Sequence, residues 1–102
     1  MNQDEARMKL AEFRVLIDDV DRRIVELLNE RTRVVEEIGR VKRLAQLPIY
    51  EPKREDEVFA NIMGCNRGPL SPEAVRGIFE RIIDEMRKIQ RLRIVADGDG
   101  KC

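Results

Sequence analysis

The chain has 102 residues, a length typical of a single domain, and 39 % of them are charged. Its 20 Lys and Arg residues balance 20 Asp and Glu residues, which argues against a nucleic-acid-binding protein that relies on an overall basic surface. Aromatic residues make up only 4 %, with 6 Gly and 4 Pro, so the composition disfavours a β-sandwich or barrel and favours long helices. The absence of His excludes Ser-His and Cys-His nucleophile pairs and a His metal cluster, and we expect no bound metal.

The sequence has no features of a secreted or membrane protein. Cys65 and Cys102 make neither a zinc site nor a disulfide framework, and the acidic N-terminus lacks the regions of a signal peptide. No apolar run is long enough to cross a bilayer. We therefore expect a reduced protein of the cytoplasm that has no membrane partner.

The first predicted element is a long amphipathic helix from about Asp4 to Ala45, which Pro48 ends. Within it, positions at alternating three- and four-residue intervals form an a/d seam, which comprises Leu10, Phe13, Ile17, Val20, Ile24, Leu27, Arg31, Val34, Ile38 and Val41. Such a helix is about 60 Å long, whereas a compact domain of this size is only about 30–35 Å across. We therefore expect the seam to continue against a second copy of the chain, in a homodimer.

Two shorter helices are expected to follow the long one. Pro52 suits the first position of the second helix, which we expect Gly64 to end. Ser71 suits the N-cap of the third helix. The polar tail over residues 96–102 has nothing to pack against, and we expect it to be disordered. The predicted fold class is all-α, with three helices in one domain over residues 1–95.

Arg31 and Lys42 are the informative charges of the long helix. Arg31 occupies a heptad position that otherwise carries Leu or Ile, where a guanidinium loses water and needs anionic partners. Alternatively, its head group leaves the seam, or it specifies register. Lys42 projects from the same face about three turns later, and two cations on one face suit a small dicarboxylate. Arg14 lies on a different face and can join Arg31 only from the other chain of an antiparallel dimer.

A pattern of particular residues continues through all three predicted helices. It consists of Arg14, Ile17, Asp18, Asp21, Ile24, Leu27, Leu28, Arg31, Lys42, Arg54, Glu55 and Gln90. The pattern spans roughly Leu10 to Arg91 and resembles the all-helical class of chorismate mutase. In that family two three-helix chains intertwine into a homodimer, and each active site takes one arginine from the partner's long helix.

The resemblance implies that the substrate is chorismate, which carries two carboxylates. Lys42 and Gln90 would be the catalytic residues, because both would donate to the ether oxygen of the C–O bond that breaks. Arg31 and the partner chain's Arg14 would hold the two carboxylates, and Arg54 would assist there.

Three further residues would complete the substrate site on the same resemblance. Glu55 would accept a hydrogen bond from the ring hydroxyl, with Glu51 near it. Glu51 replaces a commoner, shorter Asp, and Met86 stands where many relatives carry Ser. Both departures leave the arginine–lysine set intact.

The implied reaction is the intramolecular Claisen rearrangement of chorismate to prephenate, in phenylalanine and tyrosine biosynthesis. It requires no nucleophile and no cofactor, since the protein has only to hold a compact conformer and stabilise negative charge on the ether oxygen. Two alternatives stay open, an isochorismate pyruvate lyase of the same fold and a non-catalytic regulatory or dimerisation module. A nucleic-acid-binding helical hairpin is disfavoured by the neutral charge and the scarce aromatic residues.

Overall fold

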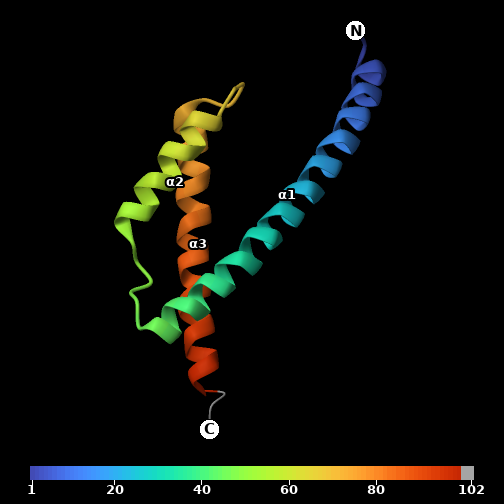
Figure 1. Cartoon of the computed structure of the whole chain (residues 1–102). Helices are drawn as coiled ribbons and strands as arrows, with labels where there is room; N and C mark the ends of the chain where they lie inside the picture. The colour runs from blue at the N-terminus through green and yellow to red at the C-terminus, as the bar shows by residue number, and fades with distance from the viewer. Residues whose placement is uncertain (100–102) are drawn as a thin grey trace. The chain divides into compact units, whose positions relative to one another are not determined.

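The structure is a computed structural model that describes the backbone of residues 1–99 and the side chains of residues 1–92. Its three helices are α1 (Gln3–Ala45), α2 (Pro52–Cys65) and α3 (Pro72–Asp99) (Figure 1). The predicted all-α class is confirmed, as is the order of a long, a short and a medium helix. None of the helices, over the residues described, is long and apolar enough to cross a membrane.

The chain divides into two units within α1, Met1–Arg33 and Val34–Cys102. The first unit is a single helical segment that begins at an Asn2 cap, whose Oδ1 accepts a backbone N–H at 2.8 Å. Its apolar seam residues are exposed, from 43 % at Val20 to 63 % at Leu27. A lone helix has no second element to cover such a stripe, so this surface is suited to a partner helix.

The second unit contains the apolar core. In it α2 and α3 lie side by side and antiparallel (Figure 1). The buried apolar residues come from the end of α1 and from α3, and they are Val35, Val75, Ile83 and Met86. The predicted cap of α3 is confirmed, because Ser71 Oγ accepts the Ala74 N–H at 3.1 Å. Packing between α2 and α3 therefore fixes the positions of their polar side chains relative to each other.

The end of α2 differs from the prediction. The helix passes through Gly64 and includes Cys65, and Gly64 does not adopt positive φ. It ends because Asn66 has an extended backbone and a side chain that organises the loop. Asn66 Oδ1 accepts the Gly68 N–H, and Nδ2 donates to the Leu70 carbonyl.

The end of α3 also lies further along the chain than expected. The helix continues to Asp99, so residues 96–99 are helical, whereas we expected a disordered tail from residue 96. No proline interrupts this stretch, and adding residues to a helix that has already formed costs little free energy. The rest of the expected tail, residues 100–102, lies outside the described residues.

Candidate active site

Lys42 is buried on the last turn of α1 although it carries a charge, with only 8 % of the residue exposed. Its Nζ donates to the Ile49 carbonyl oxygen at 2.8 Å and pairs with Glu51 Oε1 at 2.8 Å. Both acceptors lie in the segment that joins α1 to α2, so nearby chain compensates for the burial of the ammonium group. An ammonium has three N–H donors, which leaves one for a further acceptor.

Gln90 on α3 lies against the same end of α1. A Cβ atom at Gly39 would come within 3.4 Å of Gln90 Cγ, so the missing side chain at Gly39 leaves room for this glutamine. Gln90 Oε1 is buried and has no hydrogen-bond partner among the described residues. Turning the amide by 180° exchanges Oε1 for the donor Nε2. Because Gly39 and Lys42 are neighbours on one helix face, about 4.5 Å apart along the axis, Gln90 offers its amide about one helical turn from Lys42.

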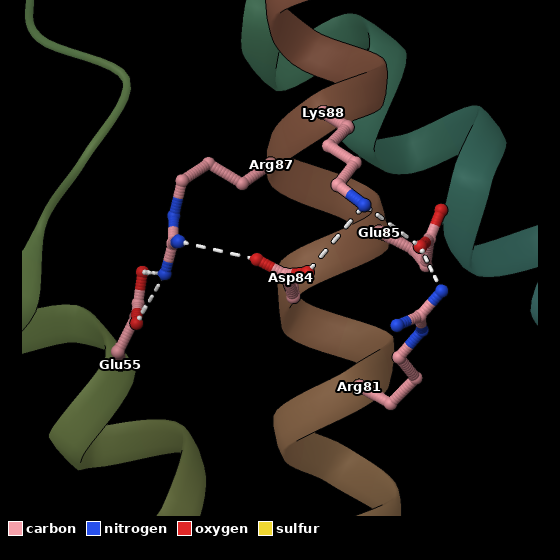
Figure 2. A network of polar contacts seen from close by, with 6 residues as sticks. All are labelled: Glu55, Arg81, Asp84, Glu85, Arg87 and Lys88. Carbon is pink, nitrogen blue, oxygen red and sulfur yellow. Dashed lines mark hydrogen bonds and ion pairs between the residues drawn. The ribbon is translucent and has the colours of Figure 1, made fainter.

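Glu55 on α2 and Arg87 on α3 form an ion pair between the two helices (Figure 2). Arg87 Nη2 donates to Glu55 Oε1 at 2.7 Å and to Oε2 at 2.6 Å, and the two side chains are 22 % and 25 % exposed. The hydrogen bond to Glu55 raises the pKa of Arg87 above its ordinary value, against the smaller opposing effect of desolvation. Glu51 lies next to Glu55, since its backbone carbonyl accepts the Glu55 N–H at 3.1 Å.

The Glu55–Arg87 pair continues into a polar network along α3 (Figure 2). Arg87 Nη1 lies 3.6 Å from Asp84, and Lys88 joins Asp84 to Glu85, which in turn pairs with Arg81. The outer members are largely exposed, and exposed ion pairs contribute little to stability. The less exposed Glu55–Arg87 pair is therefore the part of the network that holds the Glu55 side chain in one position.

The same face of α2 and α3 is hollowed into a cavity of about 470 Å³, with Phe59 and Ile83 among its apolar lining residues and both Glu55 and Arg87 at its wall. No group of three or more His, Cys, Asp or Glu residues in the described part of the chain is arranged to hold a metal ion.

The other expected site residues differ in exposure and in partners. Arg54 is exposed and pairs with Glu57 of its own helix at 3.2 Å. Met86 belongs to the core, with 6 % of the residue exposed. Arg14 is exposed and Arg31 is half-buried, and both lie in the first unit.

Arg87 is the residue at this site that the sequence did not single out. It pairs with a residue 32 positions earlier, a contact that no helical periodicity indicates. On α3 it is one of several cations, and the cations at positions 81, 88 and 91 have the same kind of sequence environment. The sequence contains no signal that separates Arg87 from these.

Comparison with known proteins supplies the family. The family model described as chorismate mutase type II matches residues 13–91. The bifunctional chorismate mutase/prephenate dehydratase of Aquifex aeolicus (strain VF5) is 37 % identical over 87 residues, which cover 81 % of this chain and 24 % of that protein. The chain thus spans about a quarter of the length of the bifunctional relatives that it matches.

Two further proteins match over most of their own length. The chorismate mutase of Methanocaldococcus jannaschii is 29 % identical over 84 residues, which cover 81 % of this chain and 85 % of that protein. The solved structure of chorismate mutase (form II) from Thermus thermophilus superposes with a TM-score of 0.79 at 37 % identity and covers 81 % of this chain and 94 % of that one. A family match that reaches from α1 into α3, with a solved relative of the same fold, shows that the chain belongs to the type II chorismate mutase family.

Proposed function

We propose that the chain catalyses the rearrangement of chorismate to prephenate. The observation that carries the proposal is the buried Lys42 ammonium with one donor left over, near Gln90, whose buried Oε1 has no hydrogen-bond partner among the described residues. An intramolecular Claisen rearrangement requires a folded substrate conformer and hydrogen-bond donors at the ether oxygen, where negative charge develops. Two donors held at one end of α1 suit that requirement and need no further reagent.

The remaining polar groups suit the substrate's other atoms. A carboxylate has about four lone-pair directions, and Arg87 takes two of those on Glu55, so Glu55 can still accept the ring hydroxyl. In this proposal Arg54 assists in binding a carboxylate of the substrate, and its ion pair with Glu57 has to break first. Because that pair is exposed, its loss costs at most about 1 kcal/mol.

We also propose that the functional unit is a homodimer in which Arg14 of one chain joins Arg31 and Lys42 of the other. Two arginines are the side chains best suited to bind two carboxylates. The support for a second chain is the exposed seam of the first unit, which comprises Leu10, Phe13, Ile17, Val20, Ile24 and Leu27. An a/d stripe of this kind is covered by a second helix in coiled coils.

Incubation of the purified chain with chorismate, followed by chromatographic measurement of prephenate, tests the proposed activity. We expect prephenate to form, and isochorismate in a parallel reaction to release no pyruvate. A wild-type chain that consumes no chorismate at millimolar concentration contradicts the proposal, and pyruvate release from isochorismate assigns the lyase instead. Native mass spectrometry of the same preparation tests the dimer.

The compartment that we propose for this reaction is the cytoplasm. The exposed free thiol of Cys65 supports it, since reducing compartments preserve such thiols. Fractionation of cells that produce the chain checks the location.

A further inference from the structure

We infer that Arg87 is a positioning residue of the proposed reaction, because it fixes the Glu55 carboxylate that accepts the ring hydroxyl of the substrate. This inference rests on the proposed function and extends it to a residue of α3.

The geometry of the pair carries the inference. A single nitrogen, Nη2 of Arg87, reaches both carboxylate oxygens of Glu55, at 2.7 Å and 2.6 Å. The other terminal nitrogen lies 3.6 Å from Asp84 on the same helix, so the guanidinium is held on α3 while it binds α2 (Figure 2). A glutamate side chain on the first turn of α2 has three rotatable bonds, and this contact restricts them.

The Arg87 guanidinium also contacts an aromatic ring. The Arg87 guanidinium carbon lies 5.0 Å from the centroid of the Tyr50 ring, a distance typical of a cation–π interaction. The neighbours of Tyr50 in the chain, Ile49 and Glu51, are the two residues that bind the Lys42 ammonium. The segment of residues 49–51 therefore contacts both Lys42 and Arg87, and it connects the donor side of the proposed site to its acceptor side.

The Nε donor of Arg87 does not take part in these contacts. Its Nε is buried without a hydrogen-bond partner among the described residues. The guanidinium is thus oriented by its contacts with Glu55, Asp84 and Tyr50. An orientation set by these three contacts keeps the Glu55 carboxylate in one place.

A displaced Glu55 carboxylate lowers the rate because it shifts the bound substrate, so that the ether oxygen is no longer correctly placed against Lys42 and Gln90. Misplacement by about 1 Å costs up to about a hundredfold in rate. We therefore expect Arg87→Met to lower kcat/KM for chorismate about tenfold to a hundredfold. A residue that contributed only to helix packing would change the melting temperature without this loss of kcat/KM in the folded protein.

A double-mutant cycle tests the inference. Chorismate turnover is measured for the wild type, Arg87→Met, Glu55→Ala and the double variant, each shown to be folded by circular dichroism. The matched control is Arg76→Met, because Arg76 also lies over an aromatic ring, that of Phe59 at 4.5 Å, and also pairs with a glutamate, Glu80 at 3.4 Å. Arg87→Lys, which keeps a cation and changes packing less, replaces Arg87→Met if that variant fails to fold.

We expect the loss caused by Arg87→Met to shrink to less than about threefold in the Glu55→Ala background, since an arginine that acts through Glu55 has nothing left to position there. Full additivity of the two losses overturns the inference, as does an equal loss of kcat/KM in Arg76→Met. A wild-type chain without chorismate turnover overturns the proposed function, and the role of Arg87 with it. An active wild type whose losses are additive overturns the role of Arg87 alone.

Discussion

Replacing Lys42 by Met removes the ammonium group and keeps a side chain of similar length. The Ile49 carbonyl loses its donor in a partly buried place, which costs about 1–3 kcal/mol of unfolding free energy, whereas Glu51 is 49 % exposed and water can replace its partner. The buried stem of the new side chain offsets part of this cost. We therefore expect Lys42→Met to remain folded, with its unfolding free energy lowered by at most about 3 kcal/mol.

The effect of Lys42→Met on the reaction should be much larger than its effect on the fold. Loss of one preorganised donor to a developing oxyanion lowers kcat about 10²–10³-fold, which corresponds to about 2.7–4 kcal/mol. Chorismate consumption and urea unfolding are measured on the same preparation, with Lys53→Met as the control because Lys53 is an exposed lysine near the start of α2. A folded Lys42→Met variant with kcat within a fewfold of the wild type refutes the assignment of Lys42 as a catalytic donor.

Three further predictions concern the amide, the glycine and the seam. Gln90→Glu should shift the activity profile toward acid pH, because a carboxyl group donates to the ether oxygen only when protonated, and an unchanged profile removes Gln90 from that role. Gly39→Val should lower kcat at least about tenfold, because its γ carbons would push into Gln90, and should lower the unfolding free energy by about 1–3 kcal/mol. Gly39→Ala should keep most of the activity, since a Cβ atom at Gly39 fits at 3.4 Å from Gln90 Cγ. Equal activity of the two variants contradicts this prediction. Ile24→Glu, on the seam, should dissociate the dimer in native mass spectrometry. Val25→Glu should leave it intact, because Val25 is also exposed (56 % against 47 % for Ile24) but lies off the seam. Dimers that survive in both variants exclude the seam as the interface.

The helices were predictable because their signals are local. A seam with a period of 3.5 residues and no proline before Pro48 gives α1, and Pro52 and Ser71 mark the starts of α2 and α3. The helix ends were less predictable because competing local contacts decide them. At α2, Gly64 is of the residue type that commonly terminates helices, but the helix ends just before Asn66, two residues later, whose side-chain hydrogen bonds organise the following loop.

The candidate site was predictable in part. The position of Lys42 follows from helical geometry, but its direct bond to Glu51 depends on the path of the loop between α1 and α2, which no periodicity specifies. The role of Arg87 depends on how α2 and α3 pack, so the sequence could not separate it from its neighbouring cations. The placement of Arg14 and Arg31 at the substrate carboxylates stays a prediction.

If each active site is completed by two chains, mixing two inactive variants should restore activity. Arg14→Ala and Lys42→Ala are denatured together, refolded as a mixture and assayed for prephenate formation. If Arg14 acts from the partner chain, each mixed dimer contains one intact site, and random pairing should restore about a quarter of wild-type activity. A mixture that forms mixed dimers by native mass spectrometry and yet stays as inactive as its two components contradicts the claim.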